Sequence, residues 1–377
     1  MLLAGLSYNR GMVEFWRAGG SESATTMNAA RKIEADGWDG QMFMDSQSLC
    51  ADPYVRMGVW AAATERLKLS TGVTNPVTRH PAVTAAAIAA VQSISAGRAV
   101  LGIGRGDSAL AYLGYAPAGL ASFRRALIDL QTLLGGGEVA FSTHDSRVDS
   151  PALDTLSLGG RPTASRLQWL PHSMPKVPLD VAATGPKVIE LCAPIAERVT
   201  FSVGAIAERV RWALDLARTA RKKQGLPEAG VSYGVQIIVV CHPDFEAVRA
   251  AATGLVAPLA RFQVIQGHAA GPKSGSDSEN FAAIRTGYDM TKHAMTLADD
   301  KIKGATLGWD FVRRFAIVGP PDHCIERLLQ LASLGIERFV IVGPGFHPEA
   351  RSSARSLFVS EVLPAVRRQL AAPGPAA

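Results

Sequence analysis

Two short polar loops, each following an apolar stretch with the character of a strand, carry the residues of this 377-residue chain that are best suited to chemistry. The first loop, Thr74-Asn75-Pro76, follows the stretch 67–73, and the second, Arg105-Gly106-Asp107-Ser108, follows 98–104. Between them lies an Ala-rich helix with Pro at its start and Gly just past its end. A strand–helix–strand unit of this length makes a right-handed parallel crossover, so both loops reach the same edge of the sheet. Ligands of parallel α/β folds bind at that edge.

The second loop offers a flexible backbone and one carboxylate. The backbone of Gly104, Arg105 and Gly106 could cradle an anion or the edge of a flat ring, and Asp107, with Ser108 beside it, could act as an acid–base group. Asp107 could equally be the N-cap of the short helix that follows. One residue can do both, so both interpretations stay open.

The end of the strand before the first loop reads Thr71, Gly72 and Val73, followed by Thr74 and Asn75. A Gly at the end of a barrel strand lets a ring or another backbone approach closely. The alternative is a strand that ends in an ordinary turn, which the Asn-Pro pair also explains.

A third candidate site is Thr184-Gly185-Pro186-Lys187, at the start of a later helix. The free amides of a helix start, with Thr184 and Lys187 nearby, could bind a phosphate. The alternative is an ordinary helix that starts at Pro and carries a solvated lysine.

Two further positions carry groups that could bind or titrate. Asp45 and Ser46 end another predicted strand, where an acid could bind the polar edge of a ring or simply lie in a loop. His80 stands before a helix start at Pro81 and could be an acid–base group or a surface residue at the helix entry.

Composition and motifs argue against several other functions. The eight histidines are scattered, with neither HExxH nor a His/Cys cluster, so no metal site is expected. The nucleophile elbow GxSxG and the Walker loop are absent from the sequence. The net charge of +6 suits an anionic small molecule, but without a basic stripe interleaved with aromatics we expect no nucleic-acid binding.

The sequence also predicts a cytoplasmic protein. Its apolar runs are far shorter than the roughly 20 residues that span a bilayer, and the N-terminus has no basic lead followed by a long apolar region. The cysteines are far apart in sequence, which indicates reduced thiols.

Helical patterns alternate with apolar stretches that are bounded by Gly or Pro. The predicted strands are 2–7, 38–44, 67–73, 98–104, 177–182, 199–203, 231–240 and 336–342. This alternation predicts an α/β fold, a single (β/α)8 TIM barrel over 1–370. A dinucleotide-binding fold needs G-x-G-x-x-G after its first strand, whereas here Asp107 takes the place of the third Gly and the motif follows the fourth strand.

Two segments interrupt the alternation and are predicted insertions after strands 4 and 7. The first, 138–175, is rich in loops; the second, 242–316, has a helical pattern and could form a lid or substrate wall. The tail 371–377 is expected to be disordered.

The motifs TGVTNPVTRHP, 71–81, and LGIGRGDSAL, 101–110, resemble the bacterial luciferase-like superfamily. The likeness is greatest to the branch of methylenetetrahydromethanopterin reductase and related deazaflavin-dependent oxidoreductases. The stretch AATGPKVIELCAPIAERVTFSVG, 182–204, supports the same branch. The resemblance spans 2–342 and is weakest over the two insertions.

This resemblance implies a barrel, usually dimeric, that binds a reduced flavin or coenzyme F-420, an 8-hydroxy-5-deazaflavin. It places a non-prolyl cis peptide at Gly72-Val73, against the ring. It maps the ring-edge acid to Asp45, the acid after strand four to Asp107, and the phosphate loop to Gly185-Pro186-Lys187. Many relatives carry His after the strand-two Asp; Ser46 stands there, so that His has no counterpart, and His80 or Asp107 is left as the substitute.

The leading hypothesis is therefore an oxidoreductase that transfers a hydride between coenzyme F-420 and an unidentified small organic substrate held under 242–316. Asp107, Asp45 and His80 are the catalytic candidates.

One alternative is an FMN-dependent luciferase-like monooxygenase that receives reduced flavin from a partner reductase. Another is a barrel that binds flavin without turnover. A homodimer is expected. The cofactor-binding candidates are Asp45, Ser46, Thr71, Gly72, Val73, Thr74, Asn75, Gly104, Arg105, Gly106, Asp107, Ser108, Thr184, Gly185, Pro186 and Lys187.

Overall fold

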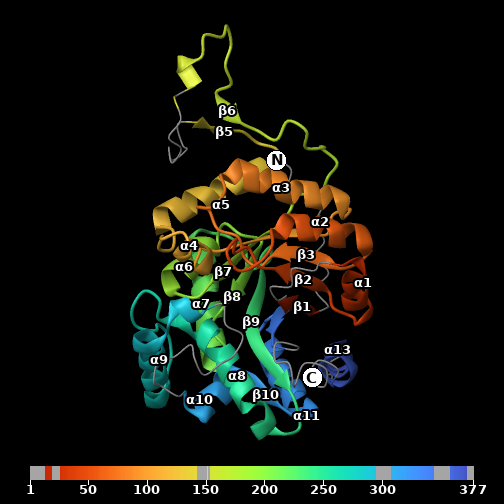
Figure 1. The fold of residues 1–377 in the computed structure, drawn as a ribbon, viewed down its shortest axis with the longest axis vertical. Coiled ribbons are helices and arrows are strands. Elements are labelled where there is room, and N and C mark those ends of the chain that lie inside the picture. Colours follow the sequence, from red (N-terminus) through yellow and green to blue (C-terminus); the bar gives the residue numbers. More distant parts are fainter. Residues whose placement is uncertain are drawn as a thin grey trace.

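The computed structural model describes residues 13–18, 26–141, 151, 153–293, 307–343 and 357–371. In this part of the chain, parallel strands close into a barrel that helices surround (Figure 1). In order around the barrel the strands are β1 (Glu14–Ala18), β2 (Gly40–Phe43), β3 (Lys68–Thr71), β4 (Ala99–Ile103), β7 (Leu179–Ala183), β8 (Arg198–Phe201), β9 (Ser232–Cys241) and β11 (Arg338–Val342). Strand β11 pairs with β1, with Phe339 opposite Phe15, which closes the circle. The predicted (β/α)8 barrel is confirmed.

The first barrel strand is the main difference from the expectation. The predicted strand 2–7 lies outside the described residues, and β1 was not predicted, because Glu14 and Arg17 break its apolar pattern. Every other predicted barrel strand overlaps an observed one. Apart from β1, each barrel strand is buried at all or all but one of its positions, as expected for parallel strands covered on both faces.

Helices follow the strands where Pro, Gly and capping residues predicted them. They are α1 (Met27–Ala35), α2 (Pro53–Ala63), α3 (Pro81–Ile94), α5 (Leu120–Leu134), α6 (Pro186–Cys192), α7 (Ala207–Lys223) and α11 (Pro321–Ser333). Asp52 caps α2 by accepting from the amides of Tyr54 and Val55. The last helical part of the described chain is a π-helical turn, Phe358–Val362, followed by α13 (Leu363–Ala371). Of the predicted tail, Ala371 ends α13 and 372–377 lie outside the described residues.

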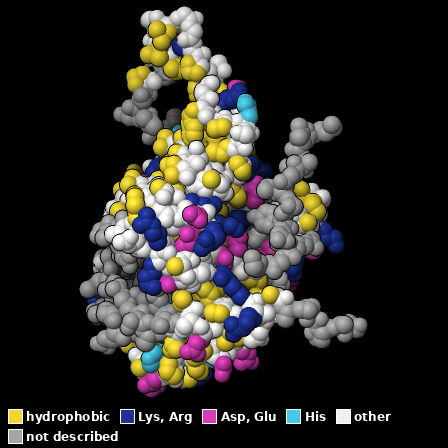
Figure 2. All heavy atoms as spheres, turned by 90° about the vertical axis from the view of Figure 1, so that its right-hand side faces the viewer, with side chains coloured by type: hydrophobic (Ala, Val, Ile, Leu, Met, Phe, Trp, Pro, Cys, Tyr) yellow, Lys and Arg dark blue, Asp and Glu magenta, His cyan; other side chains and the backbone are white. Residues whose placement is uncertain are grey.

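The segment between β4 and β7 combines a helical part with a projecting arm. The short helix α4 (Ser108–Ala111) and α5 come first. Then β5 (Val139–Ala140) pairs antiparallel with β6 (Ala164–Ser165), with the turn η2 (Leu153–Thr155) between them. This arm extends from the barrel at the top of Figure 1, and Figure 2 shows hydrophobic side chains on its surface.

The segment after β9 is largely helical, as predicted. It contains α8 (Phe245–Ala260), η3 (Arg261–Gln263), α9 (Gly275–Gly287), η4 (Met290–Lys292), α10 (Trp309–Phe315) and an unpredicted strand, β10 (Ile317–Gly319). Strand β10 adds to the outer half of β9, with Ile317 opposite Val239. These elements share an apolar core of their own. The segment is therefore an ordered structure beside the barrel mouth, and we call it the wall.

The barrel interior is packed around one large ring. Trp16 is fully buried and packs with Met42, Val100 and Val340 inside the barrel. A Cβ at residue 40 would overlap the indole of Trp16, so Gly40 makes room for it. Among the described residues, side chains thus fill the barrel below its mouth, which leaves the carboxyl ends of the strands as the place for a ligand.

Candidate active site at the barrel mouth

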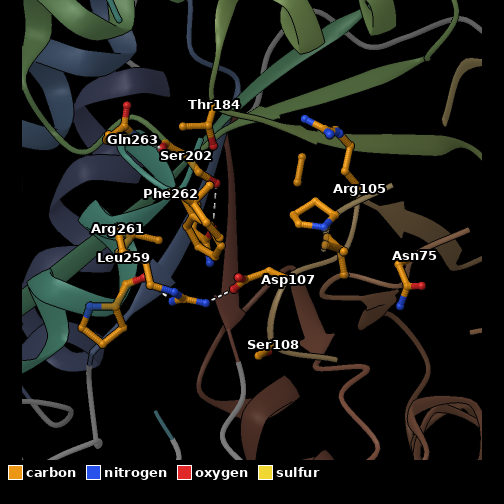
Figure 3. A pocket seen from close by; sticks show the side chains of 18 of the residues that line it. Asn75, Arg105, Asp107, Ser108, Thr184, Ser202, Leu259, Arg261, Phe262 and Gln263 are labelled. Atoms are coloured by element: carbon orange, nitrogen blue, oxygen red, sulfur yellow. Dashed lines mark hydrogen bonds and ion pairs between the residues drawn. The ribbon is translucent and has the colours of Figure 1, made fainter. Parts of the chain in front are cut away.

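A cavity of about 820 Å³ lies at the carboxyl ends of the barrel strands, a volume typical of cofactor sites. Figure 3 shows part of its lining. The loops after β2, β3, β4 and β7 form one side, and α8 with η3 forms the other. The sequence-predicted residues that line it are Asp45, Ser46, Gly72, Val73, Asn75, Gly104, Arg105, Gly106, Asp107, Ser108, Thr184, Gly185, Pro186 and Lys187.

The end of β3 presents bare backbone to this cavity. The peptide bond between Gly72 and Val73 is cis, as the resemblance implied. A Cβ at residue 72 would lie 2.6 Å from the Cβ of Met42, and a Cβ at Gly104 would lie 3.1 Å from Cγ2 of Val73. The two glycines therefore let neighbouring strands approach closely and leave a smooth surface at the mouth.

The loop after β2 carries a buried acid that is already paired. Asp45 is 7% exposed, and its Oδ2 lies 2.6 Å from the guanidinium of Arg79. Arg79 also binds Asp52 at 2.6 Å and lies over the ring of Tyr54. Ser46 lies beside Asp45, with its Oγ 3.4 Å from Oγ of Ser108.

The loop after β4 is tied to the wall opposite. Asp107 holds the N-cap position of α4 but makes no capping hydrogen bond to it. Its carboxylate pairs instead with the buried guanidinium of Arg261, from η3, which reaches toward it in Figure 3. Arg105 donates to the carbonyl of Ala118 at 2.6 Å and to Oε1 of Gln266 at 2.9 Å. Two side-chain links thus join barrel and wall across the cavity.

The proposed phosphate loop lies where α6 begins. Gly185 is the N-cap residue, with no side-chain capping bond, and Pro186 is the first helical residue. A Cβ at Gly185 would meet nothing within 4 Å, so a bound group has space there. Within the described part of the chain, Lys187 has no carboxylate partner.

Three of the candidates do not line the cavity. Thr71 is fully buried and donates to the carbonyl of Gly102 at 2.6 Å. Thr74 is also buried, and its amide donates to that same carbonyl at 2.9 Å. His80 is exposed and is the N-cap of α3, where its Nδ1 accepts from the amide of Ala82 at 3.1 Å. The helix-entry interpretation of His80 therefore matches the structure.

The floor of the cavity contains a charged cluster that the sequence analysis missed. Asp180 is 2% exposed; its Oδ2 lies 3.1 Å from Arg338, and its Oδ1 accepts from Thr200 at 2.8 Å. Below it, Arg198 binds Glu14 at 2.7 Å. These residues come from β1, β7, β8 and β11, so only barrel closure brings them together.

The wall from α8 and η3 adds further residues that sequence reasoning did not identify. It is mainly apolar where α8 ends, at Leu255, Pro258 and Leu259. Two histidines, His268 and His293, also line the cavity. The sequence predicted that 242–316 could form a lid or substrate wall, but nothing in its pattern singled out these two histidines.

Searches for two other kinds of feature were negative over the described residues. They contain no group of three or more His, Cys, Asp or Glu side chains placed to hold a metal ion. They also contain no helix that is both long and apolar enough to cross a membrane.

Sequence comparison decides the family. Residues 12–338 match the family model for luciferase-like monooxygenases. The protein belongs to the luciferase-like monooxygenase family. A 5,10-methylenetetrahydromethanopterin reductase of Methanolobus tindarius is 27% identical over 320 residues, 84% of this chain and 89% of the relative. An F420-dependent glucose-6-phosphate dehydrogenase of Microbacterium testaceum is 26% identical over 326 residues, 84% and 83% of the two chains.

Solved structures support the fold of this luciferase-like chain. The F420-dependent tetrahydromethanopterin reductase of Methanopyrus kandleri superposes with a TM-score of 0.68 at 20% identity, covering 94% of this chain and 99% of its own. An EDTA monooxygenase of Chelativorans superposes with a TM-score of 0.64 at 15% identity, covering 96% and 95%. The predicted membership of the luciferase-like oxidoreductases is confirmed.

Proposed function

We propose that this luciferase-like protein is an oxidoreductase that uses coenzyme F-420 and acts on a small organic substrate. The observation that carries the proposal is the cavity itself, where the bare backbone of Gly72-Val73 faces a mouth edged by Lys187 and Arg105. The F420-dependent relatives over most of the chain favour the deazaflavin over FMN.

The lining fits a flat ring that carries a phosphate-bearing tail. The lining acids Asp45, Asp107 and Asp180 each have an arginine partner. The positive charge of Lys187, at the start of α6, can therefore attract an anion. The chemical character of the cavity therefore matches an anionic cofactor.

Each part of the lining has a role in this proposal. Coenzyme F-420, when bound, supplies two-electron hydride chemistry. Gly72, Val73 and Gly104 form the surface against the ring, Asp45 and Asp107 orient its polar edge, and the loop 184–187 holds the phosphate. The remaining candidates, Ser46, Asn75, Arg105, Gly106 and Ser108, complete the rim, while Thr71 and Thr74 fix the strand ends behind it. The apolar end of α8 shields the substrate from water.

Titration of the purified chain with F-420 and with FMN tests this function. We expect F-420 to bind with a micromolar Kd, which the change in its fluorescence measures. Binding of FMN with none of F-420 would overturn the assignment.

The FMN-dependent monooxygenase is the second candidate, favoured by the structural likeness to the EDTA monooxygenase. A deazaflavin has carbon where flavin reacts with oxygen, so the two functions differ in oxygen chemistry. Oxygen consumption with reduced FMN, supplied by a partner reductase, would favour the monooxygenase. Binding of either cofactor without turnover of any substrate would favour the non-catalytic barrel.

The proposal extends to the domain organisation, location and oligomeric state of the protein. We expect one barrel domain over 1–370 that works in the cytoplasm as a homodimer. Exposed apolar side chains on the adjacent helices α2 and α3, at Val55, Val83 and Ile94, offer a surface for a second copy. Light scattering after gel filtration measures the oligomeric state.

A further inference from the structure

A tyrosine–histidine pair lies on the wall of the cavity that faces the barrel. Tyr288 follows α9, and His293 follows η4. The hydroxyl of Tyr288 lies 2.7 Å from Nδ1 of His293, and His293 lines the cavity. A hydrogen bond to one ring nitrogen fixes the tautomer and orientation of an imidazole.

This pair continues into the link between wall and barrel. The guanidinium carbon of Arg261 lies 5.3 Å from the ring centroid of Tyr288, and the same arginine pairs with Asp107. Burial, partly offset by the charge of Arg261, raises the pKa of Tyr288. Tyr112, whose hydroxyl lies 3.5 Å from the carbonyl of Met290, is a further titratable group beside this segment and adds to the rise in the pKa of Tyr288.

The other titratable groups of the described lining are less suited to exchange a proton with a substrate. The carboxylates of Asp45, Asp107 and Asp180 are each engaged by a guanidinium. Lys187 lies at the start of α6, where the proposed function has it hold the phosphate. Histidine is the side chain that changes its charge near neutral pH, and of the two that line the cavity His293 is oriented by a side-chain partner.

We propose that His293 is the acid–base residue of the site and that Tyr288 is its positioning residue. This assignment rests on the proposed function. When a substrate carbon bearing a hydroxyl gives a hydride to the oxidised deazaflavin, its C–H and O–H bonds break and a C=O bond forms. Nε2 of His293 takes the hydroxyl proton, and the imidazolium that results keeps its Nδ1 proton, which it donates in a hydrogen bond to the oxygen of Tyr288. In the reverse direction the imidazolium returns the proton to the carbonyl oxygen as the reduced deazaflavin returns the hydride.

The first test needs no substrate. Nitrogen NMR of the full chain with 15N-labelled histidine, with and without F-420, identifies His293 by the signal that disappears in His293→Gln. We expect this ring to titrate between about pH 5 and 8 and to hold its neutral proton on Nδ1. We expect Tyr288→Phe to remove that tautomer preference, and His172→Gln, at an exposed position outside the cavity, to leave the His293 signal unchanged. A ring that stays neutral over this range, or that holds its proton on Nε2, would overturn the proposal.

The second test uses 2-propanol and glucose 6-phosphate as probe substrates with F-420. For either one that turns over, His293→Gln should lower kcat about 100-fold or more and abolish the limb of the pH profile near neutrality. Tyr288→Phe should shift that limb rather than abolish it. An unchanged pH profile in His293→Gln would contradict the role of His293. Loss of F-420 binding by the parent chain would instead contradict the proposed function, and the NMR result would still stand.

Discussion

At Asp107 the structure argues against one of the two interpretations that the sequence left open, a capping role for its side chain. It occupies the N-cap position of α4 but does not cap the helix, because its carboxylate pairs with Arg261 across the cavity. The two residues are far apart in the chain, and no local pattern predicts their contact. The sequence could therefore identify Asp107 as a candidate but could not predict its partner.

At Gly72 a single added carbon atom would disturb the lining of the cavity. In Gly72→Ala the new Cβ would lie 2.6 Å from Cβ of Met42, and both atoms are fixed by strand backbone. We expect a loss of about 1–3 kcal/mol in stability from overpacking and at least tenfold weaker F-420 binding.

The control for this substitution lies in α2. A Cβ at Gly58 meets nothing within 4 Å, so Gly58→Ala should stabilise the protein by about 0.5–1 kcal/mol and leave cofactor binding intact. Urea unfolding and fluorescence titration measure both effects. Equal effects of the two substitutions would show that the close approach at Gly72 has no importance.

Glu14 on the barrel floor should make stability depend on pH. Burial alone would raise its pKa, but Arg198, Lys68 and Arg338 outweigh that effect and hold the pKa well below its usual range. The stabilisation is therefore fully present above the unfolded-state pKa of about 4.3 and is lost as the pH falls below it.

The variant Glu14→Gln should lose about 3 kcal/mol at neutral pH, because it removes the carboxylate that buried Arg198 binds at 2.7 Å. Its stability should fall less between pH 5 and acid than that of the parent chain. Glu279→Gln, at an exposed position on α9, serves as the control. Urea unfolding at several pH values measures the difference, and parallel pH curves for parent and Glu14→Gln would refute the assignment.

At the scale of elements, strands were predictable where burial on both faces demands an apolar run, as in β4 and β7. Strand β1 was not predicted because Glu14 is charged. Its charge is accommodated by the cluster inside the closed barrel, where it binds Arg198 of β8. β10 is three residues long and pairs only with the outer half of β9. Neither case has a local signal, because the partners that explain it come from distant parts of the chain.

A buried arginine of α7 is a further link between the wall and the barrel. Arg209 is fully buried, donates to Oε1 of Gln263 at 2.6 Å and to the carbonyl of Pro272 at 2.8 Å. Arg209→Lys cannot make this fork, so we expect a loss of about 2 kcal/mol and faster hydrogen exchange in η3 and α9. Arg211→Lys, exposed on the same helix, should change neither quantity. Equal exchange in the two variants would mean that the hydrogen bonds of Arg209 do not hold the wall in place.

At the scale of the whole molecule, the net charge of +6 and the paired acids of the cavity favour an anionic ligand. Electrostatic attraction of this kind is screened by salt, because the Debye length falls from about 10 Å at 0.1 M to about 3 Å at 1 M. We expect the Kd for F-420 to rise roughly tenfold over that range.

Lys187 should account for a measurable part of this salt dependence, because it lines the cavity where α6 begins. In Lys187→Gln, F-420 should bind more weakly at low salt, and its Kd should change less as salt is added. Lys222→Gln removes the same charge from the end of α7, outside the cavity lining, and should retain the steeper slope of the parent chain. The same slope in Lys187→Gln and Lys222→Gln would place the attraction in the overall charge of the molecule, and the loop 184–187 would then have no special part in holding the phosphate.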